Sequence, residues 1–168
     1  MKLTTSLTST AVFLCASAMN AMAADQAPPA STPAPTMNIV SGPDAVKWGP
    51  GSPALPPGAQ MAVMTGNPGS TGFVSIRAKL PAGYTVPPHS HPTDEHVTVL
   101  SGSMAFGMGD AMDPKTETAV APGGYFAAPQ GMHHYARTAS GAEIQIDLMG
   151  PFGITYVNPA DDPRNAKK

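Results

Sequence analysis

The density of glycine and proline limits the fold of this chain more than any other feature, because it leaves little room for long helices. The sequence has 17 Gly and 20 Pro in 168 residues, and no long segment repeats apolar residues at helical spacing. Short alternating or β-branched runs recur instead, separated by turn sequences. We expect strands at 60–65, 73–80, 96–100, 104–108, 125–128, 133–137 and 143–148. This spacing, with no internal repeat, predicts one all-β sandwich or barrel.

The beginning of the chain differs in composition from the central part. Residues 1–23 have one positive charge, an uncharged and partly apolar run and an Ala-Met-Ala cleavage site, which is the anatomy of a secretory signal peptide. A membrane anchor needs about 20 predominantly apolar residues, and this run is too polar. Residues 24–37 are rich in Pro and Ala and predict a disordered linker. We expect one domain over 38–160 and a charged tail over 161–168.

Signal cleavage after Ala23 predicts a periplasmic or secreted protein. It also removes Cys15, the only cysteine, so the mature chain has no disulfide or thiol chemistry. Without Lys2, eight basic residues face eleven acidic ones, which gives a net charge of −3. This balance predicts no nucleic-acid partner and, after cleavage, no membrane partner.

A short histidine-rich segment suggests a metal site. His89 and His91 are two residues apart, and residues at this spacing on a strand point to the same face. Glu95 follows four residues later and reaches the same point if it lies on the next strand. Imidazole and carboxylate ligands together suit a divalent transition metal.

The other histidines restrict this site further. The five histidines lie in two short segments, and the second contains His133 and His134 directly after a Pro-x-Gly turn. Neighbouring residues on a strand point opposite ways, so at most one of this pair joins the site easily. We expect His96 and His133 to be surface or interface residues, and Asp94 to be solvated or to lie just outside the ligands.

These two segments resemble the two sequence motifs of the cupin superfamily. The first motif is matched at every fixed position, by Gly83, His89, His91, Glu95 and Gly102. The second is matched by Gly123, Pro129, Gly131 and His134, with Thr138 in place of its final asparagine. The resemblance covers about residues 79–148.

The resemblance implies a single double-stranded β-helix, or jelly-roll, barrel. It further implies that His89, His91, Glu95 and His134 bind one divalent metal ion, which is Mn, Fe, Ni, Zn or Cu. Cupin barrels often pair through an outer sheet, so we also expect a homodimer.

We expect an apolar pocket around the metal, suited to a small-molecule substrate or ligand. Its predicted wall consists of Tyr84, Val97, Val99, Met104, Phe106, Met108 and Tyr135. The alternating Met104, Phe106 and Met108 fit a barrel core, with a thioether copper site as the alternative. No general acid or base can be assigned from the sequence.

Two kinds of function remain open. The first is a metal-dependent enzyme, with a dioxygenase or other oxidoreductase ahead of a decarboxylase or isomerase. The second is a non-catalytic periplasmic protein that binds a metal or a small ligand. A third, a sensor resembling zinc-binding anti-sigma factors, conflicts with export. The segment 150–164 either closes the barrel mouth or adds an edge strand to a partner subunit, and we favour a structural role.

The signal peptide gives a direct prediction. The mature protein recovered from the periplasm or medium should begin at Ala24, because the small residues before it suit signal peptidase. N-terminal sequencing and intact mass would check this. A protein recovered with Cys15 still present would contradict it.

Overall fold

The computed structural model describes residues 37–166. The predicted signal peptide with Cys15, nearly all of the linker and the last two tail residues lie outside this range. The described part has eleven strands, three 3-10 helices and no α-helix, and none of its helices is long and apolar enough to cross a membrane. The strands are β1 (Gly49–Pro50), β2 (Gln60–Thr65), β3 (Gly72–Leu80), β4 (Thr85–Ser90), β5 (Glu95–Gly102), β6 (Met104–Met108), β7 (Thr118–Val120), β8 (Tyr125–Ala128), β9 (His134–Arg137), β10 (Ala142–Gly150) and β11 (Thr155–Tyr156), and the helices are η1 (Pro43–Ala45), η2 (Pro159–Asp161) and η3 (Pro163–Asn165).

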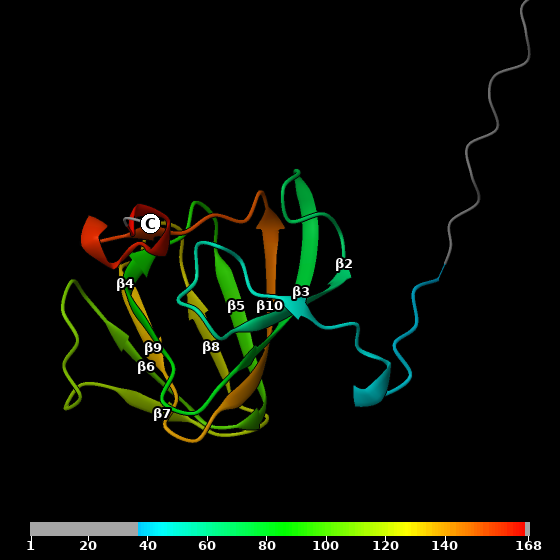
Figure 1. Cartoon of the computed structure of the whole chain (residues 1–168), viewed down its shortest axis with the longest axis horizontal. Coiled ribbons are helices and arrows are strands. Elements are labelled where there is room, and N and C mark those ends of the chain that lie inside the picture. The colour runs from blue at the N-terminus through cyan, green and yellow to red at the C-terminus, as the bar shows by residue number, and fades with distance from the viewer. Residues whose placement is uncertain (1–36, 167–168) are drawn as a thin grey trace, which may run out of the picture. The chain divides into compact units, whose positions relative to one another are not determined.

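Two antiparallel sheets form the domain. The first has six strands in the order β1-β2-β3-β10-β5-β8, and the second has five in the order β11-β4-β9-β6-β7. Strands distant in sequence are neighbours, as β3 with β10 and β4 with β9 (Figure 1). The predicted all-β jelly-roll class is confirmed.

The structure contains all seven strands predicted from the sequence, and β2, β6 and β8 have the predicted bounds. It also contains β1, β4, β7 and β11, which are outside the list of expected strands. β4 includes Pro87 and Pro88, which lack the N–H groups of a sheet ladder. These prolines lie where the pairing of β4 with β9 shifts register, between Val86 and His89. The irregularity accommodates both prolines next to the first histidine.

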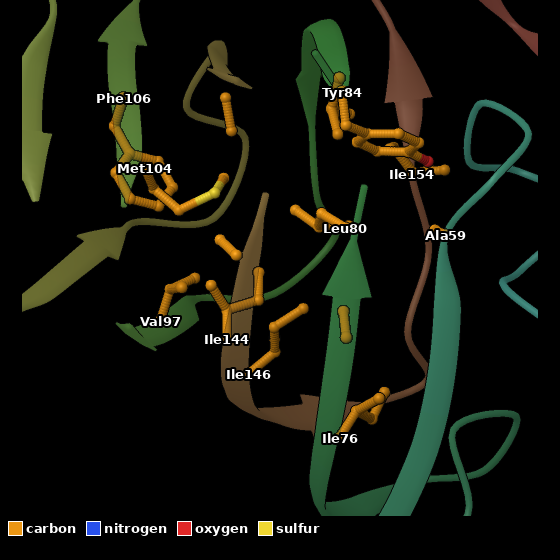
Figure 2. Packing of buried hydrophobic residues seen from close by; sticks show 14 of the residues in the cluster. Ala59, Ile76, Leu80, Tyr84, Val97, Met104, Phe106, Ile144, Ile146 and Ile154 are labelled. Atoms are coloured by element: carbon orange, nitrogen blue, oxygen red, sulfur yellow. The ribbon is translucent and has the colours of Figure 1, made fainter. Parts of the chain in front are cut away.

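Strict alternation along β10 builds one wall of the core. Ala142, Ile144, Ile146 and Leu148 are buried, whereas the intervening residues are more exposed. They pack with inward residues of the neighbouring strands in a continuous cluster between the sheets (Figure 2). Fully burying one such aliphatic side chain contributes about 1.5–3 kcal/mol to stability. The buried faces of the nine-residue strands β3 and β10 therefore stabilise the packing of one sheet on the other.

The outer side of β6 is covered by the ring of Tyr135. This side chain is fully buried, and its hydroxyl donates to the Asp113 carbonyl at 3.0 Å and accepts from the Asp113 N–H at 2.8 Å. A Cβ atom added at Gly107 would lie 2.1 Å from the ring. Glycine is therefore required at position 107 by the close approach of Tyr135.

Replacing Gly107 with alanine should destabilise the domain by about 1–3 kcal/mol, the usual range for overpacking. The ring cannot move aside without breaking both hydrogen bonds to Asp113. Thermal unfolding of G107A and of the control G42A would measure the effect, because a Cβ at Gly42 meets no atom within 4 Å. Equal unfolding midpoints for the two variants would contradict this packing.

Candidate metal centre

The four predicted ligands come from both sheets. His89 on β4 is the cross-strand partner of His134 on β9. His91 follows β4 by one residue, and Glu95 begins β5 in the opposite sheet. All four side chains are buried, so the fold brings the two sequence motifs together inside the barrel.

The distances fit a single cation. His89, His91 and His134 each offer a ring nitrogen, and these atoms lie within 4.8 Å of one another. This upper limit is slightly longer than twice the ~2.1 Å length of a metal–nitrogen bond, so the three atoms lie near the spacing of ligands to one ion. Glu95 Oε2 lies 3.5 Å from His91 Nε2 and 3.3 Å from His134 Nε2. The carboxylate is therefore placed beside two of the three rings.

Backbone carbonyls orient all three imidazoles. His89 Nδ1 lies 2.7 Å from the Pro87 oxygen, and His134 Nδ1 lies 3.0 Å from the Met132 oxygen. His91 Nδ1 lies 2.6 Å from the oxygen of Gly153. Since a carbonyl can only accept, each Nδ1 donates to its carbonyl, which leaves Nε2 as the ligand atom of each ring. Such outer hydrogen bonds fix the tautomer and orientation of metal-binding histidines.

The donor set fits a divalent metal ion. His91 Nε2 is buried without a hydrogen-bond partner, and the Glu95 carboxylate beside it is also an acceptor. Buried acceptors that face one another are costly unless a cation lies between them. A proton on His134 satisfies only one contact, whereas a metal ion satisfies every inward-facing group. His89, His91, His134 and Glu95 are thus the residues that would hold the metal.

The electrostatics keep these groups in their ligating forms. Burial, reinforced by the neighbouring His134 and His91, lowers the pKa of His89 to about 3. Burial alone would raise the pKa of Glu95, but the contact with His134 and the proximity of His91 and His89 hold it below its usual value. Near neutral pH, His89 is therefore a neutral ligand and Glu95 an anionic one.

The four groups open into a small apolar cavity of about 50 Å³, which is room for a few water molecules. Among the described residues, its only ionisable lining groups are the four proposed ligands. The remaining lining residues are Leu55, Met61, Ala78, Leu80, Val86, Val97, Met104, Phe106, Ala136, Ile144, Ile146, Phe152 and Ile154. Val97, Met104 and Phe106 therefore line it as predicted.

Four of the predicted wall residues lie elsewhere. Val99 is buried in the core away from the cavity, and Tyr84 directs its hydroxyl to the Pro56 carbonyl. Tyr135 faces the opposite side of β9, over Gly107. Met108 is 66% exposed, because β6 ends there and turns away at Gly109. Alternation along the strand placed Met108 on the same side as Met104. It could not show that Met108 lies at the rim of the barrel, where the strand ends.

The remaining histidines lie outside the cluster. His96 is exposed and contacts the Tyr125 hydroxyl, and His133 Nδ1 lies 2.6 Å from the Asp110 carboxylate. Asp94 is also exposed and accepts a hydrogen bond from the Gln130 N–H at 2.7 Å. These positions agree with the face assignments made from the sequence.

The C-terminal segment, for which the sequence left closure of the barrel mouth as one alternative, contributes directly to the site. Phe152 stacks on His91 with ring centroids 5.3 Å apart, and the neighbouring carbonyl of Gly153 orients the same ring. Ile154 lines the cavity. The alternation of Ile154 and Tyr156 as buried residues was the one available signal, and it gives no indication of which strand they join.

Comparisons with known proteins agree with this fold. Residues 76–148 match the Cupin domain family called Cupin_2. No curated protein is significantly similar in sequence. Among solved structures, an RmlC-like cupin from Shewanella frigidimarina has a TM-score of 0.51 at 13% identity, covering 65% of this chain and 87% of the other. The family match concerns this central segment of the chain, and the likeness to the solved structure concerns the fold.

Two further structures are similar over more of the chain. The polyketide cyclase RemF from Streptomyces resistomycificus has a TM-score of 0.58 at 22% identity, covering 76% of this chain and 90% of its own. A putative acetylacetone dioxygenase from Methylibium petroleiphilum has a TM-score of 0.57 at 18% identity, covering 79% of this chain and 90% of its own. At these identities the likeness concerns the fold.

The geometry separates the two adjacent histidines of the second motif. His134→Ala should lower zinc affinity by more than the ~10–100-fold typical of losing an outer hydrogen-bond partner, because it removes a ligand. His133→Ala should keep the affinity, since His133 contacts Asp110 at the surface. Competition with a chromophoric chelator would measure both. Equal losses would contradict the assignment of His134.

Proposed function

We propose that this protein is a metal-dependent cupin with oxidoreductase activity of the dioxygenase type on a small organic substrate. The observation that carries the proposal is the combination of a three-histidine, one-carboxylate cluster with an otherwise apolar cavity. Three neutral imidazoles and one carboxylate leave a net charge of +1 on a divalent ion. The identity of the metal is open among Mn, Fe, Ni, Zn and Cu, although the redox reaction requires a redox-active one.

Each residue of the proposed centre has a physical task. The carbonyls of Pro87, Met132 and Gly153 hold the imidazoles in register, and Glu95 offsets one positive charge. A metal ion held by these residues would supply Lewis acidity and a template for O₂ and an organic ligand. Val97, Met104 and Phe106 exclude bulk water from the bound molecules.

The cavity lining favours some substrates and reactions over others. No lysine or arginine lines it in the described part of the chain, so a highly charged anion has no cationic side chain to bind it. No carboxylate or histidine outside the ligand set is available there as a general acid or base. We therefore rank a decarboxylase or isomerase below oxygen chemistry on a small, weakly polar chelating molecule. The neighbour described as a putative acetylacetone dioxygenase is a reason to include β-diketones among the test compounds.

The second candidate function is non-catalytic binding of a metal or small ligand. The cavity of about 50 Å³ favours it, because little space remains for two reactants without movement of the lining. In that case the buried ligands would serve affinity alone.

We also propose that the protein acts outside the cytoplasm as a homodimer. Export is supported by the sequence of residues 1–23, which lie outside the described range. The exposed Phe73 and Met149, cross-strand partners on the six-stranded sheet, are compatible with pairing through that sheet.

Elemental analysis and oxygen consumption together test the enzyme proposal. Protein matured by export should contain a redox-active metal and consume O₂ with at least one compound from a panel of β-diketones, catechols, flavonols and dicarboxylates. Glu95→Gln should lower the rate at least about tenfold, because the charge of a proposed ligand is lost. Asp94→Asn is the matched control, since Asp94 is exposed and lies outside the cluster.

Each alternative result has a clear meaning. Zinc with no turnover but tight ligand binding would favour the binding protein. Protein without a bound transition metal, after maturation and metal supply, would overturn the enzyme proposal and the metal-binding form of the second candidate.

A further inference from the structure

A segment near the end of the chain completes the environment of His91. The Gly153 carbonyl accepts the proton of His91 Nδ1 at 2.6 Å, and the ring of Phe152 stacks on the imidazole. The adjacent Ile154 forms part of the cavity wall. We call residues 151–165 the C-terminal strap. Its first half therefore sets both the orientation of one proposed ligand and the apolar cover beside it.

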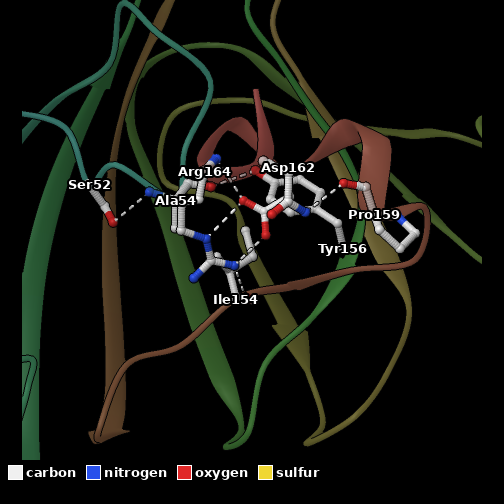
Figure 3. Close-up of polar contacts among 8 residues, drawn as sticks. Ser52, Ala54, Ile154, Tyr156, Pro159, Asp162 and Arg164 are labelled. Carbon is white, nitrogen blue, oxygen red and sulfur yellow. Dashed lines mark hydrogen bonds and ion pairs between the residues drawn. The ribbon is translucent and has the colours of Figure 1, made fainter. Parts of the chain in front are cut away.

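Short backbone pairings hold the strap against the metal centre. Tyr156 pairs with His89 through β11 and β4, and the Val157 N–H donates to the Pro88 carbonyl at 2.9 Å. The buried hydroxyl of Tyr156 donates to the Ala54 carbonyl at 2.8 Å, and burial raises its pKa to about 12, which keeps it a donor (Figure 3). β11 has only two residues, so side-chain contacts supply much of its anchorage.

Arg164 reaches back from η3 to the strap's first half. Its Nη2 donates to the Ile154 carbonyl at 3.1 Å, one residue after the carbonyl that orients His91. The same guanidinium forms a fork with Asp162, with Nε–Oδ1 and Nη2–Oδ2 distances of 2.8 and 2.7 Å (Figure 3). The fork fixes the plane of the guanidinium, and with it the direction of the bond to Ile154.

We propose that Arg164 is a positioning residue for the metal centre, acting on His91 through the strap. This inference rests on the metal centre of the proposed function. Without the guanidinium, the Ile154 carbonyl loses its side-chain donor and the two-residue strand frays. The Gly153 carbonyl then no longer holds His91 in the Nδ1–H form, and Phe152 no longer covers the ring.

Removing the Arg164 side chain should affect the metal site more than the stability of the domain. The Arg164 side chain is 46% exposed, and exposed ion pairs contribute about 0–1 kcal/mol. Removing it should therefore change the unfolding of the metal-free protein little. The geometry of the metal site should change more, because loss of an outer partner of a ligand typically lowers affinity ~10–100-fold.

The experiment compares Arg164→Ala with Arg137→Ala in the mature protein. Arg137 forms a similar paired contact with Glu117, its side chain is 39% exposed, and it does not line the cavity. Zn²⁺ affinity would be measured by chelator competition, ligand geometry by the visible spectrum of bound Co²⁺, and stability by thermal unfolding without metal. We expect R164A to bind Zn²⁺ about tenfold more weakly with an altered Co²⁺ spectrum. R137A should keep the Zn²⁺ affinity and Co²⁺ spectrum of the wild type, even if it lowers thermal stability as much as R164A or more.

Two further measurements sharpen the result. Nitrogen NMR of the metal-free protein should show His91 in the Nδ1–H form in the wild type and a mixture of tautomers in R164A. Asp162→Asn should shift the affinity in the same direction by a smaller factor, because it loosens the fork but leaves the arginine. The double variant with Asp162→Asn and Arg164→Ala should bind Zn²⁺ as weakly as R164A alone.

The outcomes distinguish this inference from the proposed function. Wild-type Zn²⁺ affinity, Co²⁺ spectrum and His91 tautomer in R164A would overturn the positioning role and leave the oxidoreductase proposal standing. Weakened metal binding in R164A, with no oxygen consumption by the wild type, would support the positioning role and remove the oxidoreductase. Equal effects of R164A and R137A on affinity would assign the change to general destabilisation and overturn the inference.

Discussion

Three hydrogen bonds from ring nitrogens to backbone carbonyls determine what this barrel can hold. The carbonyls of Pro87, Met132 and Gly153 take the protons of the three imidazoles, so the unprotonated nitrogens face inward. Each carbonyl belongs to the backbone, which makes the orientation a property of the fold rather than of an adjustable side chain. A cation bound between the buried His91 Nε2 and the nearby Glu95 carboxylate would neutralise both acceptors.

The two sheets contribute different parts of the centre. His89 and His134 are cross-strand partners within one sheet, while Glu95 begins a strand of the other. A bound cation would therefore link the sheets at the mouth of their shared core. Binding to the folded state alone stabilises that state by mass action, so metal loading would be coupled to folding in this protein.

Much of this arrangement was predictable from the sequence because it follows from local patterns. Alternation gave the strands and the inward sides of Val97, Met104 and Phe106, and the motif spacing gave the four clustered groups. Other features depend on tertiary contacts that alternation does not encode. Met108 lies at the strand's exposed end, and Tyr135 packs on the outer side against a glycine.

The roles of Leu55 and Phe152 in the cavity wall were equally hidden, because their segments join the barrel only through non-local contacts. The sequence also did not distinguish a strap folded onto its own barrel from one donated to a partner. In this structure Tyr156 pairs with His89 of the same chain. Pro87 and Pro88 concealed β4, although the register shift in the sheet accommodates both.

The long separation in sequence between His91 and Gly153 has a consequence for biosynthesis. A nascent chain that has emerged only through His134 already carries all four ligating side chains, but it lacks the carbonyl that orients His91. Contacts of such long sequence separation form late in folding. A metal ion held by all four groups would therefore be bound in its final geometry only after the C-terminal strap has folded onto the barrel.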